Sequence, residues 1–112
     1  WLTNLDNMLY YVEYDVEGSS NYALPLILRN DNNKMKEVCR VLEEEKVEYR
    51  LGTAGGGNQA RQPYLVEGRY DYAIIDDLTN ADHVHEYGLY IGNHTDLSEQ
   101  QIINLCNRIN NV

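Results

Sequence analysis

The residues best suited to chemistry lie in segment 50–65, which reads Arg-Leu-Gly-Thr-Ala-Gly-Gly-Gly-Asn-Gln-Ala-Arg-Gln-Pro-Tyr-Leu. Its run of glycines lets the backbone approach a ligand closely, because glycine has no Cβ. Arg50, Asn58, Arg61 and Gln62 offer guanidinium and amide donors, which suit oxyanions and other polar groups. The segment therefore predicts a loop that holds a polar, anionic partner, and the alternative interpretation is a flexible surface loop.

The pair Asn93-His94 is the second candidate, because it follows a short apolar run and precedes a predicted helix cap. In open α/β sheets, side chains at the carboxyl end of a strand often line a binding site. The residues alone leave two interpretations open. Either Asn93 and His94 contact a ligand, or they form the turn before the helix.

Other reactive side chains lack the spacing typical of a catalytic or metal site. His83 and His85 stand two residues apart and do not share a helical face, so we expect surface residues rather than metal ligands. Asp76-Asp77 is expected to form a turn. All lysines fall in or beside one predicted surface helix: Lys34, Lys36 and Lys46. We therefore expect no catalytic residue and no bound metal in this chain.

The size and charge of the chain limit the kinds of molecule that it is expected to bind. The chain has 112 residues and a formal net charge of −9, which fits one domain and disfavours nucleic acids and anionic membranes. The sequence contains no apolar run of membrane-spanning length and no signal-peptide pattern. Cys39 and Cys106 occupy apolar helix positions, which favours free, buried thiols in the reducing cytoplasm over a disulfide.

Hydrophobic periodicity predicts the elements that position these candidates. Strands are expected at 22–29, 47–50, 70–75 and 89–92, with an extended segment at 9–14. Helices are expected at 33–46, from a capping box at Thr79-Asn80-Ala81-Asp82 to Gly88, and after a second capping box at Ser98. Residues 1–8 are interpreted as the end of a helix, and 51–68 as irregular.

This order of elements predicts an α/β (α+β) fold, a two-layer sandwich whose small, mostly antiparallel sheet has helices packed on one face. We expect residues 1–20 to be a linker or the end of an interdomain helix, and 21–112 to be one small domain. Because the chain begins at Trp1, we expect a piece of a longer protein. The acidic run Glu43-Glu44-Glu45 predicts a solvated helix end that frays, since acids oppose the helix dipole there.

Four stretches together carry a resemblance to a known family: Val-Glu-Tyr-Arg at 47–50, Gly-Asn-Gln-Ala-Arg-Gln-Pro at 57–63, Tyr-Gly-Leu-Tyr-Ile-Gly-Asn-His at 87–94 and Leu-Ser-Glu-Gln-Gln-Ile at 97–102. Over roughly residues 20–112, the chain resembles the C-terminal small domain of the DegT/StrS-type sugar aminotransferases. These are pyridoxal-phosphate enzymes of the aspartate-aminotransferase fold type. The Gly-Asn-His ending is similar to the branch that acts on nucleotide-linked 4-keto-6-deoxyhexoses, which includes 3-dehydratases.

The resemblance implies a homodimeric enzyme of polysaccharide biosynthesis whose large domain holds pyridoxal phosphate through a lysine, replaced by histidine in some dehydratases. The small domain of such enzymes closes over the active site and helps form the nucleotide-sugar pocket. By position, the residues implied to contact the sugar or its phosphates are Arg50, Asn58, Arg61, Gln62, Asn93 and His94. The chain departs from the family pattern in its extra glycines and lacks the large domain, so we expect it not to catalyse the reaction alone.

Two other hypotheses stay open. One is a stand-alone, non-catalytic α/β module that binds a small ligand or a protein through the same loop. The other is a split-gene remnant that pairs with a separate large-domain chain. The coding sequence upstream of Trp1 distinguishes the stand-alone module from the family interpretation. Mixing the chain with a separate large-domain chain and looking for cofactor absorption tests the split-gene hypothesis. Neither the sugar, nor the nucleotide, nor the choice between transamination and dehydration follows from these residues.

Overall fold

The computed structural model describes residues 1–29, 32–52, 57–68, 71, 73–74 and 77–112. In chain order, its elements are the 3₁₀ helix η1 (Leu2–Asn4), β1 (Ala23–Ile27), α1 (Asn32–Glu44), β2 (Tyr49–Leu51), the 3₁₀ helix η3 (Gln59–Arg61), α2 (Pro63–Val66), α3 (Thr79–Tyr87), β3 (Gly88–Gly92) and α4 (Glu99–Asn110). The predicted α/β (α+β) fold class is confirmed. The predicted boundaries of β1, α1, β2, α3, β3 and α4 lie close to those observed.

The described strands form an antiparallel sheet in the order β1-β3-β2, so β3 is central. At the two ends of the β1–β3 pairing, the Leu28 N–H donates to the Tyr87 carbonyl and the Asn93 N–H donates to the Tyr22 carbonyl. Bonded positions alternate along an antiparallel pair, which turns the ring nitrogen of Pro25 away from β3. Pro25, which has no backbone N–H, therefore fits its place in β1 at the edge of this sheet.

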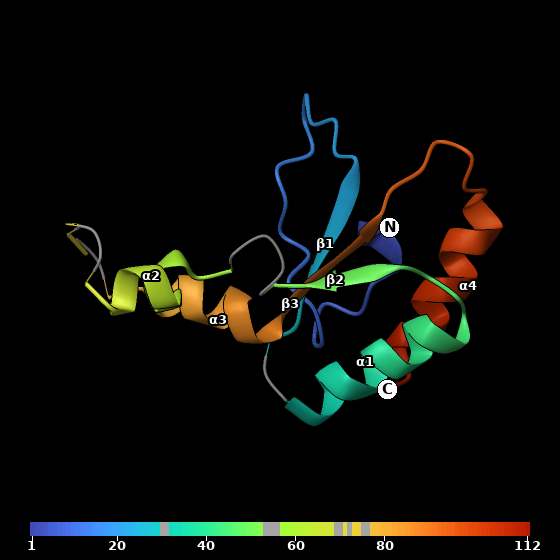
Figure 1. Cartoon of the computed structure of the whole chain (residues 1–112). Helices are drawn as coiled ribbons and strands as arrows, with labels where there is room; N and C mark the ends of the chain where they lie inside the picture. Colours follow the sequence, from blue (N-terminus) through green and yellow to red (C-terminus); the bar gives the residue numbers. More distant parts are fainter. Residues whose placement is uncertain (30–31, 53–56, 69–70, 72, 75–76) are drawn as a thin grey trace.

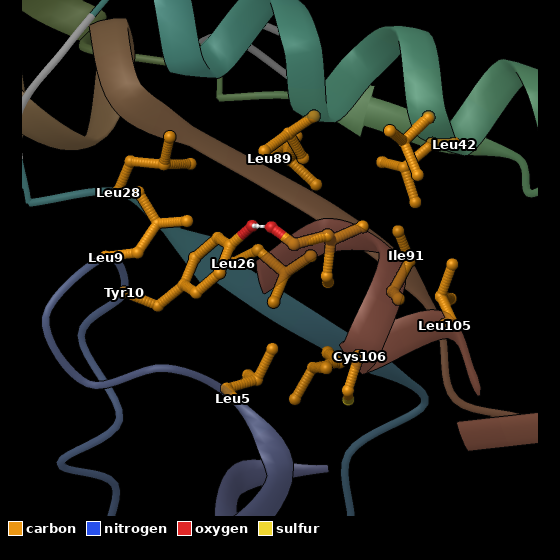
Figure 2. Packing of buried hydrophobic residues seen from close by; sticks show 14 of the residues in the cluster. Leu5, Leu9, Tyr10, Leu26, Leu28, Leu42, Leu89, Ile91, Leu105 and Cys106 are labelled. Atoms are coloured by element: carbon orange, nitrogen blue, oxygen red, sulfur yellow. Dashed lines mark hydrogen bonds between the residues drawn. The ribbon is translucent and has the colours of Figure 1, made fainter. Parts of the chain in front are cut away.

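The hydrophobic core lies between the sheet and the helices α1 and α4, which cover one of its faces (Figure 1). Leu26 of β1 and Ile91 of β3 face this layer and are almost completely buried. Tyr10 is also buried, and its hydroxyl donates to the Ile109 carbonyl at 2.7 Å inside the core (Figure 2). The remaining core residues include Leu5, Leu9, Leu24, Leu28, Met35, Val38, Val41, Leu42, Leu89, Leu105 and Cys106.

Local hydrogen bonds define the ends of both covering helices. The predicted capping box at Ser98 is confirmed, because its hydroxyl accepts from the Gln101 N–H while the Gln101 side chain accepts from the Ser98 N–H. At the end of α1, Lys46 has a φ of 57° and its N–H donates to Glu43, in the pattern of a Schellman turn.

The fraying expected at the end of α1 stays a prediction, although the same region holds partners for its acids. Arg108 of α4 contacts Glu44 at 2.9 Å and Glu45 at 3.2 Å. The acids at the end of α1 therefore face a cation on the neighbouring helix, which offsets their unfavourable position in the α1 dipole. The Schellman turn and these ion pairs close the helix end.

The N-terminal segment differs from its prediction. The helix expected at 1–8 is reduced to η1, and the extended segment expected at 9–14 pairs with the sheet through an isolated bridge between Tyr10 and Leu28. Burial explains the difference, because the apolar side chains of this segment enter the core shared by β1 and α4. Tertiary contacts thus override the local helical pattern.

The described residues between 57 and 87, which carry η3, α2 and α3, project from the sheet as an arm (Figure 1). We call the other described residues, 1–29, 32–52 and 88–112, the body. The radius of gyration is 15.7 Å, above the roughly 13 Å expected for a compact chain of this length. No residue of η3, α2 or α3 is buried, so the arm adds little to the core.

Two predictions concern the arm. The stretch expected to be irregular, 51–68, contains η3, which is capped by Asn58, and α2, which begins at Pro63, because these residues favour helix starts. Half of the strand expected at 70–75, namely residues 70, 72 and 75, falls outside the described residues. Those of its residues that are described, Asp71, Ala73 and Ile74, are not in a strand.

Candidate functional site

The second half of the Gly-rich segment docks onto α3 through polar groups that we call the Asp82 cluster: Asn58, Arg61, Asp82 and His85. Arg61 donates from Nε and Nη2 to the two carboxylate oxygens of Asp82, at 2.5 and 2.6 Å. Such a bidentate pair is among the stronger charge-assisted hydrogen bonds. Asn58, only 5% exposed, donates from its side chain to the same carboxylate and from its backbone to Nδ1 of His85 at 3.1 Å.

The charges within the Asp82 cluster reinforce one another. The hydrogen bonds from Arg61 hold the pKa of Asp82 well below its ordinary value, at about 2, and the Asn58 amide lowers it further. Asp82 in turn raises the pKa of Arg61. Since Nδ1 of His85 accepts a backbone hydrogen bond, that nitrogen carries a lone pair in this arrangement.

Glycine is required where this segment meets α3. Gly57 has a φ of 48°, and a Cβ at this position would overlap with the His85 ring. A Cβ on Gly52 would overlap with the backbone carbonyl of Val84. The close backbone approach predicted from the sequence is therefore made to α3 of the same chain. The remaining glycines of the run, at 55–56, lie outside the described residues.

Three of the predicted site residues thus lie on the arm. Asn58 and Arg61 direct donors toward Asp82 within the chain. Gln62 is the residue that precedes α2, and its N–H donates to the Gln59 carbonyl at 3.0 Å. Their contact with a substrate stays a prediction.

Asp82 and His85 were missed as partners of the Gly-rich segment. The expected capping box is wrong, because the Asp77 carboxylate accepts from the Thr79 N–H and leaves Asp82 to bind Arg61. A signal for the cluster was present in the sequence: Asp82 and His85 stand three residues apart, and such residues share one helical face.

The expectation that His83 is a surface residue is also corrected. His83 is half-buried at the base of the arm, and its Nε2 lies 2.7 Å from the Leu28 carbonyl. The imidazole ring stands edge-on to Tyr11 at 5.6 Å and lies beside Tyr87 at 4.9 Å. His83 therefore joins α3 to β1 and to the N-terminal segment.

Arg50 lies elsewhere, in a hollow on the sheet face opposite the helices, which we call the open-face pocket. Along β3, Tyr90 alternates with the buried Leu89 and Ile91, so its side chain points to this face. Arg50 pairs with Tyr90 in the β2–β3 register, and its Nη2 lies 3.2 Å from Glu48. The pocket has a volume of about 210 Å³, and its lining includes Tyr22, Ala23, Glu48, Arg50, Tyr90 and Gly92.

Asn93 and His94 line a second hollow where β1 begins and β3 ends, which we call the sheet-end pocket; its volume is about 510 Å³. Asn93 accepts from the Trp1 indole at 3.0 Å and donates to the Asn21 carbonyl at 2.9 Å. The His94 side chain is exposed, with Nδ1 3.7 Å from Asp96. The two residues form the turn before α4 and also line the pocket, so the two interpretations of the sequence do not exclude each other.

The predicted site residues therefore form two groups along β3. The group toward the carboxyl end of β3 comprises Arg50, Asn93 and His94. The group joined through α3 to the amino end of β3 comprises Asn58, Arg61 and Gln62. A five-residue strand separates its own ends by only about 14 Å, but no described contact within the chain joins the two groups.

The remaining chemistry of the described residues is limited. They contain no group of three or more His, Cys, Asp or Glu side chains able to hold a metal ion. None of the described helices is both long enough and apolar enough to cross a membrane. The prediction of free thiols is confirmed for Cys39 and Cys106, and burial raises the pKa of both.

Comparison with known proteins gives one curated relative. The chain is 32% identical over 98 residues to GDP-4-keto-6-deoxy-D-mannose 3-dehydratase from Yersinia pseudotuberculosis. The match covers 86% of this chain but 24% of the dehydratase, so the chain spans about a quarter of that enzyme's length. No protein-family profile and no solved structure matches the chain. The sequence is thus distantly similar to a limited part of an enzyme that acts on a nucleotide-linked sugar.

Proposed function

We propose that this chain is the C-terminal small domain of a pyridoxal-phosphate-dependent aminotransferase or dehydratase of the DegT/StrS type. Its substrate class is a nucleotide-linked 4-keto-6-deoxy sugar, as named for the relative. The observation that carries the proposal is this similarity over most of the chain, and it is supported by Arg50 in one pocket and Asn93 and His94 in a second pocket that shares Ala23 with the first. A guanidinium suits diphosphate oxygens, and amide and imidazole groups suit sugar hydroxyls.

The implied cofactor does not fit the residues of this chain. Lys34 donates to the Val112 carbonyl at 2.9 Å, while Lys36 and Lys46 are exposed. None of these lysines, all of which belong to the described part of the chain, lines the open-face or the sheet-end pocket. We therefore assign pyridoxal phosphate and the reacting groups to the large domain. The small domain would contribute substrate contacts and exclude water.

The arm supports a further part of the proposal, its partner. Val66 is 67% exposed and Ile74 is 52% exposed, and neither joins the core. A partner that covered these side chains would remove apolar surface from water, which is favourable. We propose that the arm contacts the large domain or the second subunit of a homodimer in the cytoplasm, and that residues 1–20 lead to the large domain.

The test uses the full-length protein that contains this segment. It should bind pyridoxal phosphate, seen as visible absorption, and bind a GDP-linked 4-keto-6-deoxy sugar. Arg50→Gln should raise the dissociation constant for the sugar nucleotide by about tenfold or more, because a charge-assisted hydrogen bond is lost. Arg40→Gln removes the same charge from α1 and serves as the control. Failure to bind both cofactor and sugar nucleotide would contradict the proposal.

The alternative function, a non-catalytic binding module, is favoured by one observation. The body has its own hydrophobic core, built from segments at both ends of the chain. Such a body can fold without another domain. An upstream coding sequence without a cofactor-binding domain would support this alternative. A separate large-domain chain that gains cofactor absorption on mixing with this one would instead support a split enzyme.

A further inference from the structure

The open-face pocket combines aromatic rings with a guanidinium group. Tyr22 is 84% exposed at the rim, and Tyr90 stands opposite Arg50 in the strand register. Every nucleobase has a flat face that stacks on an aromatic side chain. The fork of an arginine matches the oxygens of a phosphate. The pocket therefore matches the base and the diphosphate of a nucleotide.

Arg50 has a partner in the chain, but a weak one. Its contact with Glu48 is 3.2 Å long, and the two side chains are 60% and 82% exposed. Ion pairs this exposed contribute little, because water and salt screen them. A diphosphate carries more charge than a carboxylate and offers several oxygens, so it can replace Glu48 as the partner of Arg50. Glu48 would then oppose nucleotide binding by competing for the same guanidinium.

The sheet-end pocket has a different chemistry. Hydroxyl and amide side chains dominate the polar part of its lining, among them Ser19, Ser20, Asn21, Asn93 and Thr95. Among the described residues that line it, His94 is the sole one with an ionisable side chain. Neutral groups that both donate and accept hydrogen bonds suit sugar hydroxyls better than phosphates.

The two pockets adjoin. Ala23 lines both of them, and the Asn93 N–H bonds to the Tyr22 carbonyl at 2.9 Å, which links one lining to the other. We propose that they are consecutive subsites for one nucleoside-diphosphate sugar. The base stacks on Tyr22 and Tyr90, the diphosphate displaces Glu48 from Arg50, and the sugar lies against Asn93 and His94. This assignment rests on the proposed function and adds the order in which the ligand lies.

The test follows backbone amide shifts of the full 112-residue chain during titration with millimolar GDP, then with GDP-mannose, with mannose and pyrophosphate alone for comparison. GDP should shift residues 22, 50 and 90, and GDP-mannose should extend the shifts to residues 93–95. Arg50→Gln should weaken GDP binding by about tenfold. Glu48→Gln should strengthen it by roughly twofold to threefold. Arg40→Gln should leave it unchanged.

Three outcomes would overturn the assignment. In the first, GDP shifts the amides of residues 93–95 and leaves those of 22, 50 and 90 unchanged. In the second, Arg40→Gln weakens GDP binding as much as Arg50→Gln. In the third, GDP leaves the whole spectrum unchanged. Each of them leaves the proposed function to be judged by cofactor and substrate binding in the full-length protein. If that protein binds pyridoxal phosphate and a nucleotide sugar while the subsite shifts are absent, the order of subsites alone is wrong.

Discussion

The body and the arm are each stabilised by a different kind of interaction. In the body, Leu26, Ile91 and Tyr10 are almost completely buried between the sheet and the helices α1 and α4. In the arm, Arg61 and Asp82 bind each other at the surface and no residue of η3, α2 or α3 is buried. Apolar burial contributes roughly 25 cal/mol per Å², whereas exposed ion pairs contribute little.

This difference assigns separate roles to the two regions. All buried hydrophobic residues described in the core lie in the body, and the arm adds the half-buried Tyr87 at the end of α3, so the body can stay folded when the rest of the arm shifts. The arm can release or shift at a small free-energy cost, as is common for elements at binding surfaces. Leu28 joins the two regions, because its carbonyl meets Nε2 of His83 and its N–H donates to the Tyr87 carbonyl. Substitutions in the body should therefore unfold the chain, and those in the arm should act locally.

The largest effect is expected from the core. Leu26→Ala should lower the free energy of unfolding by about 2–5 kcal/mol, because it removes buried methyl groups and leaves a cavity. Val66→Ala, on the exposed side of the arm, is the control and should stay within about 0.5 kcal/mol. Urea unfolding followed by circular dichroism measures both. Equal losses of unfolding free energy in the two variants would mean that the arm and the body unfold together as one cooperative unit.

The next effect concerns the polar group inside the core. Tyr10→Phe should cost about 1–3 kcal/mol, because the buried Ile109 carbonyl loses its donor. Burial also raises the pKa of Tyr10. The native state therefore favours the neutral phenol, and its stability should fall as pH rises above about 10. Thermal unfolding between pH 8 and 11 should show that decline in the native chain and a weaker one in the variant.

A local effect is expected where the Gly-rich segment meets α3. Gly57→Ala adds a Cβ that overlaps with the His85 ring, at a positive φ that disfavours side chains. Gly68→Ala shares the positive φ but meets nothing within 4 Å, so it is a matched control. Amide exchange at residues 58–61 should quicken by about tenfold or more in Gly57→Ala. Exchange in β3 should stay unchanged, and faster exchange throughout the body would contradict the separation of the two regions.

The smallest effect is expected when the pH is lowered until Asp82 becomes protonated. Because Asp82 has a pKa lowered to about 2, its contribution is present above its ordinary value of 3.8 and is lost as pH falls toward 2. Amide shifts of residues 58–61, which report Asp82 in the folded chain, should therefore change with a midpoint near pH 2. Asp82→Asn should remove this transition, while Glu86→Gln on the same helix should keep it. A transition that persists in Asp82→Asn would assign it to another carboxylate.

Predictions from the sequence succeeded where the interaction is local. Ser98 and Gln101 stand three residues apart, and their capping box is present as expected. The same reasoning failed at Thr79 and Asp82, although the pattern is equally good. The difference is Arg61, which reaches Asp82 from a position that is 21 residues earlier in the chain. A sequence pattern that spans one helical turn contains no information about a competing partner so far away in the chain.

The candidate site shows the same division. The glycines of segment 50–65 were predicted to allow a close approach to a ligand, and at Gly57 and Gly52 the structure shows a close approach to α3 of the same chain. From the sequence, Arg50 and Arg61 were equally good candidates for binding an anion. In the fold, one lines an exposed pocket beside Tyr90 and the other is engaged by Asp82. Substrate contacts of these residues stay predictions.

The sequence by itself determined β1, β2, β3, α1, α3, α4 and the capping box at Ser98. Each depends on periodicity or on hydrogen bonds within about four residues, which neighbours in the chain control. Only the tertiary structure decided that Asn58 and Arg61 bind Asp82 while Arg50, Asn93 and His94 gather near one end of β3. Those partners come from distant parts of the chain, and only folding around the shared core brings them within reach.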